Sequence, residues 1–253
     1  VVEATAVERR GRITHHCVGL YSDQNEDSIR NVLNAARSVA TNDLKFAIQL
    51  GHAGRKASHN VPWQGGKALA MNEDSWITVA PSALPFTQGS HLPEALNKDG
   101  LQQIIQNFVN AAIRAVRLGF SAIELHGAHG YLIHEFISPI SNQREDEYGG
   151  TLTNRMKFPL EIFDNVRKVV PADIPLGIRL TGTDWREDGL SIKDSQIVAQ
   201  NFAEHGADYL CISSGGITTG LKIPIAPNYQ VHLAKAVKDV VSIPVRAVGL
   251  ITT

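Results

Sequence analysis

The stretch IELHGAHGYLIHEFISP, residues 123–139, begins as a buried strand, breaks at glycines, places two histidines three residues apart and then becomes helix-like. On both sides of it, short apolar runs alternate with longer runs of 3.6-residue period, which is the pattern of parallel βα units. We expect strands at 1–7, 45–50, 121–126, 176–180, 208–213 and 243–248. Helices are expected at 27–39, 99–117, 154–169, 193–205 and 229–240.

The position of the polar residues separates the two architectures that such units build, a closed (β/α)8 barrel and an open doubly wound sheet. In a barrel, functional side chains gather just after the strands. Here Gln49, His126, His129, Arg179 and Ser213 each lie at or just past the end of a predicted strand. The glycine pattern G-x-G-x-x-G of a dinucleotide-binding sheet follows none of the predicted strands. We therefore predict a single-domain TIM barrel over residues 1–253, with the first and last barrel strands missing from this sequence.

The remaining segments fit one α/β domain. Residues 51–98 are rich in Gly, Pro, Ser and Trp with little periodicity, which is typical of an elaborated loop on the functional face. Ser191, followed three residues later by Asp194, resembles a capping box that opens a helix. Trp63, Trp76 and Phe86 in the long loop either wall a substrate cavity or pack within the loop.

Composition excludes several classes of function. The 253 residues are 43% hydrophobic and carry a formal net charge of −1, so no basic surface for nucleic acid is expected. No apolar run approaches the roughly 20 residues that span a bilayer, so no membrane partner is expected. Two cysteines make no disulfide framework, and the N-terminal residues lack the features of a signal peptide, so a cytoplasmic protein is expected.

Six motifs, taken in order, resemble the old yellow enzyme family of FMN-dependent ene-reductases, and are most similar to its thermophilic-like or xenobiotic-reductase branch. They are VVEATAV (1–7), AIQLGHAGRKAS (47–58), APSALPF (80–86), the run 119–162 with REDEYGG, IRLTGTDW (178–185) and SSGG (213–216). The resemblance implies FMN as cofactor and NAD(P)H as co-substrate. It also implies that the substrates are activated alkenes, namely enones, enals, maleimides and nitroalkenes, and that the protein forms a dimer or tetramer.

The resemblance also implies which residues bind the flavin. The backbone of Ala4 corresponds to a position beside the ring, and Gln49 to the glutamine that hydrogen-bonds the pyrimidine edge. Arg179 corresponds to the arginine beside N1 and O2, where a permanent cation stabilises the negative charge of the reduced ring. Gly249 corresponds to part of the phosphate site, while the family's main phosphate anchor lies past residue 253.

The same resemblance assigns His126 and His129 to the carbonyl or nitro oxygen of the substrate, and Tyr131 to proton delivery. Hydride attack on an activated alkene moves charge onto the conjugated oxygen, and two imidazole N–H groups aimed at it would stabilise that charge. The histidines would then be electrophiles rather than bases, and the hydride would come from flavin N5.

Two other readings stay open. The paired histidines could bind a metal in a non-redox lyase or isomerase, although there is no H-E-x-x-H motif and no third ligand at a recognisable spacing, so no metal is expected. The absent phosphate anchor suggests a truncated, cofactor-free barrel that acts as a non-catalytic binding module. Apart from these roles, Arg144, Asp146, Tyr148, Asn154 and Arg155 are expected to hold the loop after the third predicted strand and to cap the next helix.

Overall fold

The computed structural model describes residues 1–41 and 43–252, and within them one parallel sheet of six strands forms the centre of the molecule. Its strands are β1 (Val2–Ala6), β2 (Ala47–Gly51), β5 (Ala122–Gly127), β6 (Leu176–Thr181), β7 (Tyr209–Ser213) and β8 (Val245–Ala247). Each strand lies inside its predicted range or extends one residue past it, so the six strand predictions are confirmed.

The order of the strands identifies the architecture. Neighbours in the sheet follow chain order, β1-β2-β5-β6-β7-β8, whereas a doubly wound sheet reverses its direction of growth partway. Gln49 pairs with Glu124, His126 with Arg179, and Cys211 with Arg246. Because side chains alternate across a strand, this register places Gln49, Glu124, His126 and Arg179 on one face of the sheet. The sheet is thus of the barrel type, and its concave face carries the polar groups.

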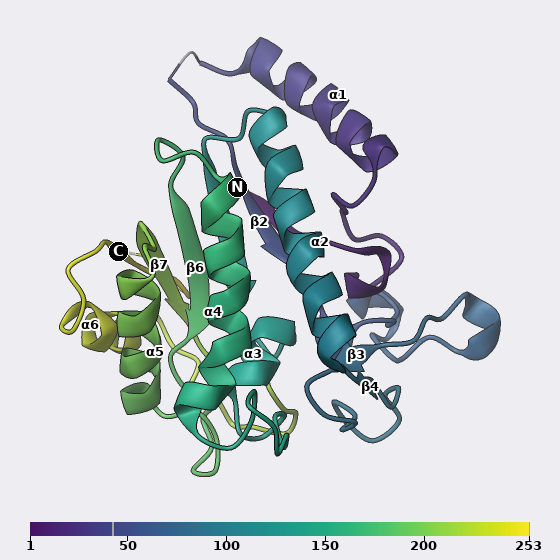
Figure 1. Cartoon of the computed structure of the whole chain (residues 1–253), viewed down its shortest axis with the longest axis vertical. Coiled ribbons are helices and arrows are strands. Elements are labelled where there is room, and N and C mark those ends of the chain that lie inside the picture. The colour runs from purple at the N-terminus through teal and green to yellow at the C-terminus, as the bar shows by residue number, and fades with distance from the viewer. Residues whose placement is uncertain (42, 253) are drawn as a thin grey trace.

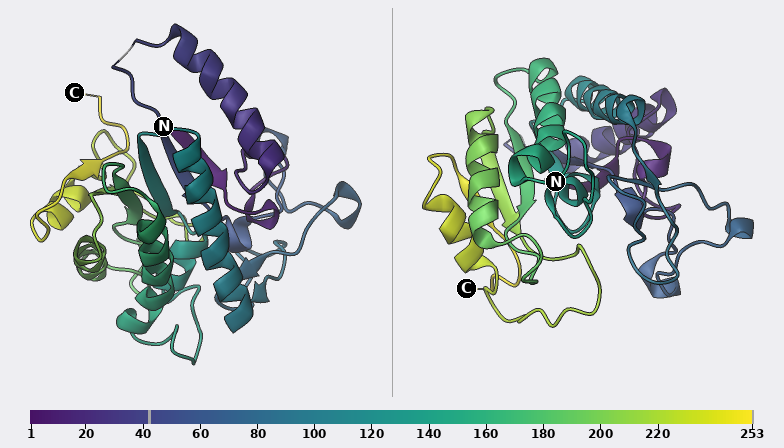
Figure 2. Two further views of the ribbon diagram at one scale, coloured as in Figure 1. Left: turned by 45° about the horizontal axis from the view of Figure 1, so that its top comes forward. Right: turned by 60° about the horizontal axis from the view of Figure 1, so that its bottom comes forward.

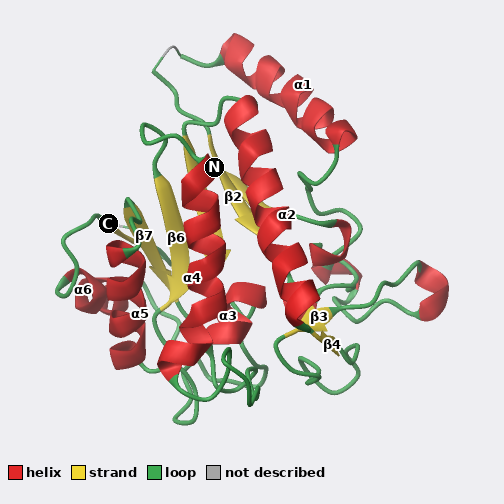
Figure 3. Cartoon of the chain, in the orientation of Figure 1, coloured by secondary structure: helices red, strands yellow, loops and turns green. Residues whose placement is uncertain are grey.

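Helices cover the other face of the sheet. They are α2 (Lys98–Arg117), α4 (Leu152–Val169), α5 (Ile192–Glu204) and α6 (Val231–Lys238), while α1 (Asp23–Val39) lies farther out (Figures 1 and 3). Phe108, Phe163 and Phe202 on their inner faces are fully buried. The predicted capping box forms, because Ser191 Oγ accepts the Asp194 amide and the Asp194 carboxylate accepts the Ser191 amide. Across the residues described, no helix is long and apolar enough to cross a membrane.

The segment 51–98 is an elaborated loop, as predicted, and not a further βα unit. It contains the 3-10 turns Gly54–Lys56, Pro62–Gln64 and Met71–Glu73, and a pair of two-residue strands, β3 (Val79–Ala80) and β4 (Glu94–Ala95). Part of it projects from the body of the molecule (Figure 2). Arg144 pairs with Asp146 inside the loop after β5, as expected, and donates to the carbonyl oxygens of Pro81 and Leu96, at 2.9 and 2.7 Å, so it also ties the two loops together. The residue that caps α4 is Thr151 and not one of the predicted set.

Candidate active site

Three aromatic side chains, one from the end of β5 and two from the turn after it, meet at the carboxyl end of the sheet. The ring centroid of His126 lies 5.1 Å from that of His129 and 4.9 Å from that of Tyr131, and all three pairs are edge-to-face. Tyr131 is the N-cap residue of the short helix α3 (Leu132–Ile137), which is the helix-like segment expected after the two histidines. The turn depends on Gly130, whose φ is +71° and whose Cβ would lie 2.1 Å from the carbonyl oxygen of Gly216.

His126 is a neutral hydrogen-bond donor. Burial, together with the nearby His129 and Arg179, holds the pKa of His126 well below its ordinary value. Its Nδ1 accepts the amide N–H of Ala128 at 3.3 Å, so the single ring proton is on Nε2. The Nε2–H group is therefore the one that His126 can offer to a ligand.

His129 is neutral as well, because burial and Arg179 lower its pKa to about 3. Its Nε2 lies 2.7 Å from Ser213 Oγ. The alternative acceptor for the Ser213 hydroxyl is Gln230 Oε1, at 3.3 Å, and this atom already receives Ser214 Oγ at 2.6 Å. We therefore assign the Ser213 hydroxyl as the donor to His129 Nε2, and with this assignment the ring proton of His129 is on Nδ1.

Tyr131 is a protonated phenol, since burial, with Cys17 and Glu3 nearby, raises its pKa to about 12. The ammonium of Lys56 lies 5.0 Å from the centre of the Tyr131 ring. The same ammonium donates to the carbonyl oxygens of His129 and Gly216, at 2.8 and 3.0 Å. Lys56 therefore ties the turn that carries His129 to the loop after β7. Burial lowers the pKa of Lys56 to about 8.

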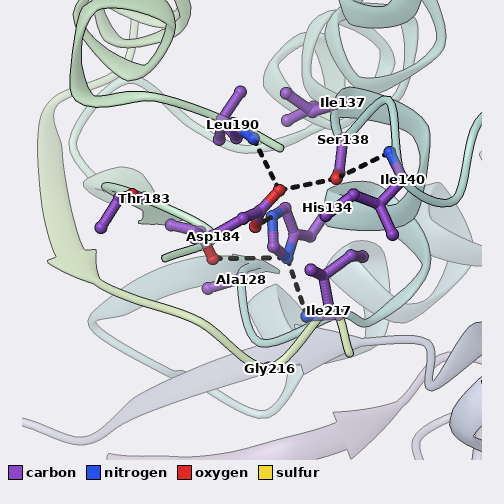
Figure 4. A network of polar contacts seen from close by, with 12 residues as sticks. Ala128, His134, Ile137, Ser138, Ile140, Thr183, Asp184, Leu190, Gly216 and Ile217 are labelled. Atoms are coloured by element: carbon purple, nitrogen blue, oxygen red, sulfur yellow. Dashed lines mark hydrogen bonds and ion pairs between the residues drawn. The ribbon is translucent and has the colours of Figure 1, made fainter. Parts of the chain in front are cut away.

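A second network holds the same turn from beneath (Figure 4). His134 Nδ1 accepts the amide of Gly130 at 2.8 Å, and its Nε2 lies 3.0 Å from Asp184 Oδ1. The other Asp184 oxygen accepts the hydroxyl of Ser138 and the amide of Leu190, at 2.7 and 2.8 Å. Although burial raises the pKa of Asp184, His134 and these hydrogen bonds bring it below the ordinary value, so the carboxylate is ionised.

Three residues assigned to the flavin ring, Ala4, Gln49 and Arg179, lie on the concave face of the sheet next to this group. Ala4 has a φ of +39° and donates its amide to Gln49 Oε1 at 3.1 Å. Ala4 and Gly51 line one pocket together with His126 and Tyr131. Within the described chain, Arg179 makes no ion pair, and its buried Nε has no hydrogen-bond partner. Among the described residues, the Arg179 guanidinium makes one hydrogen bond, from Nη2 to Ser213 Oγ, and it is long at 3.4 Å. A cation in this state fits the anionic edge of a reduced flavin.

The remaining predicted residues lie around the three aromatic rings or in the long loop. Gly249, which the sequence assigned to part of the phosphate site, has a φ of +97° and lies past the end of β8 next to Gln230 and Tyr229. Trp63 is 80% exposed, so it neither walls a cavity nor packs within the loop. Trp76 donates its indole N–H to the carbonyl oxygen of Arg10, so it packs within the loops. The centre of the Phe86 ring lies 4.6 Å from the Lys56 ammonium.

The sequence reasoning assigned no role to Lys56, Ser213 or His134. Lys56 lies in the motif GHAGRKAS and Ser213 in SSGG. Both motifs were recognised, but neither side chain was given a specific function. The signal that could have found Lys56 is its position just after a barrel strand, where functional side chains gather. His134 lies on α3, and only the folded turn brings it under Gly130.

Comparison with known proteins agrees with this geometry. Residues 1–253 match the NADH:flavin oxidoreductase / NADH oxidase family. The chain is 42% identical to an NADH:flavin oxidoreductase of Gibberella zeae, covering 100% of this chain and 65% of the relative. It is 41% identical to an NADPH dehydrogenase of Geobacillus sp. (strain WCH70), covering 100% and 68%. The chain thus spans about two thirds of the length of these relatives.

Solved structures show the same fold. Morphinone reductase is 25% identical, with a TM-score of 0.76 over 98% of this chain and 66% of its own. Histamine dehydrogenase from Rhizobium sp. 4-9 is 26% identical, with a TM-score of 0.81 over 100% of this chain and 36% of its own. A structure of morphinone reductase contains tetrahydroNAD. These findings confirm the family and its TIM-barrel fold, and the family and the two relatives above are named for reactions of flavin, NADH or NADPH.

The chain therefore belongs to the NADH:flavin oxidoreductase / NADH oxidase family, the old yellow enzyme family that its sequence motifs indicated.

Proposed function

We propose that the protein uses FMN and NAD(P)H to reduce C=C bonds that are conjugated to a carbonyl or nitro group. One observation carries the proposal: two neutral imidazoles, His126 and His129, each keep one N–H for a ligand next to the protonated phenol of Tyr131. The names of the relatives support nicotinamide-dependent redox chemistry. The reduction of enones is a more specific proposal than redox chemistry with a nicotinamide nucleotide, and it is inferred from these three side chains.

FMN, when bound, supplies the hydride for the alkene. His126 Nε2–H and His129 Nδ1–H donate to the carbonyl or nitro oxygen and draw electron density from the conjugated C=C bond. Negative charge grows on that oxygen, and donors fixed in a buried site stabilise it without reorganisation. Tyr131 gives its phenolic proton to the other alkene carbon, so that hydride plus proton saturate the bond. The Lys56 ammonium at the ring face stabilises the phenolate that remains until solvent reprotonates it.

Two features of the histidine pair favour an oxygen that gains charge during the reaction over a simple bound anion. Neutral imidazoles do not bind a simple anion as strongly as imidazolium would, so the site favours an oxygen that becomes charged during the reaction. His126 is also only 4% exposed, and a hydrogen bond to a developing charge is stronger in such a buried setting than in water.

The test is product analysis without oxygen. The FMN-loaded protein is incubated with NADPH and cyclohexenone, and NADPH consumption is compared with cyclohexanone formed. We expect one cyclohexanone for each NADPH, and loss of both in the His126→Ala/His129→Ala double variant with FMN still bound. If cyclohexenone stays unchanged without oxygen and NADPH is consumed only in a parallel aerated sample, the protein is an oxidase and the proposal is rejected.

A further inference from the structure

A buried polar cluster lies beside Gln49 on the concave face of the sheet, and the mechanism above does not use it. Its centre is Glu124 on β5, which is 2% exposed. Glu124 Oε1 accepts Gln49 Nε2 at 2.7 Å, and Oε2 accepts Arg246 Nη2 from β8 at 2.5 Å. Tyr209 on β7 borders the cluster, since burial and the Glu124 carboxylate raise the pKa of its phenol.

These contacts determine which way the Gln49 amide faces. A backbone N–H is only a donor, so the Gln49 atom that meets Ala4 N at 3.1 Å must be the oxygen. Glu124 accepts Arg246 on one carboxylate oxygen and meets Gln49 with the other, so the Gln49 atom that meets Glu124 is the donating nitrogen. The opposite orientation would set oxygen against carboxylate and NH2 against N–H, and would leave buried groups unsatisfied on both sides.

Arg246 keeps this arrangement in place. Its guanidinium donates to the second oxygen of Glu124, which leaves Oε1 for Gln49. The Arg246 side chain is 45% exposed, so the arginine reaches the cluster from a partly solvated position. The Glu124 carboxylate, which orients the Gln49 amide, is thus paired with a cation from β8. Gln49 itself lies on β2, on the other side of β5 in the sheet.

Once fixed, the Gln49 amide has one N–H and one oxygen lone pair that no group in residues 1–41 and 43–252 occupies. A flavin pyrimidine edge presents an N–H donor, N3, between two carbonyl acceptors. An amide of fixed orientation therefore matches that edge as one donor and one acceptor, whereas a freely flipping amide would match it only part of the time.

We propose that Glu124 and Arg246 are positioning residues for the cofactor, which fix the Gln49 amide so that it recognises the N3–H and adjoining carbonyl of the flavin pyrimidine. This inference rests on the proposed function, because it takes Gln49 as a flavin ligand. Glu124 acts only through Gln49.

The test compares FMN with 3-methyl-FMN, in which a methyl group replaces the N3 hydrogen. Dissociation constants for the flavin-free protein are measured by flavin fluorescence, and their ratio cancels the contribution of the phosphate. We expect the native protein to prefer FMN by on the order of tenfold, the effect of one well-made hydrogen bond. Glu124→Gln, which can present N–H as well as oxygen to Gln49, should reduce the preference to about twofold. Arg246→Met should lower it in the same direction.

A matched control is Glu26→Gln on α1. Glu26 is also a buried carboxylate, paired with Arg114 and Arg117, but it lies away from Gln49. This variant should lose stability while the preference for FMN stays native. A second readout uses no flavin: the side-chain amide protons of Gln49, observed by NMR after glutamine labelling, should exchange slowly in the native protein and faster in Glu124→Gln and Arg246→Met.

The outcomes separate the two claims. If Gln49→Leu abolishes the preference for FMN while Glu124→Gln and Arg246→Met keep it, Glu124 does not orient the amide and the inference is wrong, although the function stands. If the native protein binds both flavins equally, or Gln49→Leu changes nothing, Gln49 is not the pyrimidine ligand, and the inference is rejected together with that part of the proposed function.

Discussion

Replacing His126 by alanine tests the oxyanion role of the histidine pair most sharply. The change removes one of two N–H donors and leaves His129, Tyr131 and the flavin residues in place. His126 is neutral, so the loss is that of a neutral donor and not of a charge. Removing one donor from such a site lowers a rate by about 10²–10³, or roughly 3–4 kcal/mol, and a neutral donor belongs at the lower end of that range.

The assay is a single turnover. The FMN-loaded variant is reduced by dithionite, which bypasses NADPH, and mixed with cyclohexenone while flavin reoxidation is followed. We expect a rate about 10² lower than that of the native protein, with FMN affinity unchanged. His126→Gln, whose side-chain NH2 can replace the Nε2–H donor, should recover roughly tenfold of the loss. A native rate in His126→Ala, or an equal loss in His126→Gln, would refute the donor role.

Three further predictions follow from the charges of the site. Arg179→Met should weaken FMN binding by on the order of tenfold and lower the flavin potential, and full occupancy at a native potential would contradict its place beside the anionic ring. Because the pKa of His129 is about 3 and that of Tyr131 about 12, the single-turnover rate should stay level from about pH 5 to pH 7 and fall only as the Lys56 ammonium loses its proton near pH 8, whereas an inflection at the ordinary pKa of histidine would show a titrating imidazole. Burial raises the pKa of Glu135 from 4.5 to about 8, so its contribution to stability is complete below pH 4.5 and is lost as the pH rises through 8. The free energy of unfolding, measured with urea, should therefore rise for Glu135→Gln relative to the native protein by up to a few kcal/mol between pH 5 and pH 8.5. Plots of this free energy against pH that stay parallel for the two proteins would contradict the prediction.

The sequence predicts the strands well because each is a short apolar run bounded by turn residues, and β6 and β7 match within one residue. Helix starts were placed less well, since α1 begins at Asp23 and not at Asp27. Its cap, Ser22, precedes a polar first turn that has no apolar period to mark it. Patterns of hydrophobicity locate buried faces, but a polar helix end depends on capping contacts.

The site divides along the same line. His126, His129, Tyr131 and Gln49 could be predicted as site residues because they stand at or just past strand ends inside specific motifs. Tautomers, and the partners that fix them, could not be predicted, because they depend on contacts between residues far apart in the chain, as between His129 and Ser213. The ion pair of Glu124 with Arg246 joins residues 122 positions apart, and no local pattern signals it.

The visible absorption spectrum of the purified chain, incubated with FMN and desalted, tests the central claim most directly. Without oxygen, NADPH and then cyclohexenone are added in turn. The account predicts that the flavin bands stay with the protein, bleach with NADPH and return with cyclohexenone. A colourless protein after desalting would contradict it and favour a cofactor-free binding module, and bands that bleach but do not return would contradict the reduction of activated alkenes.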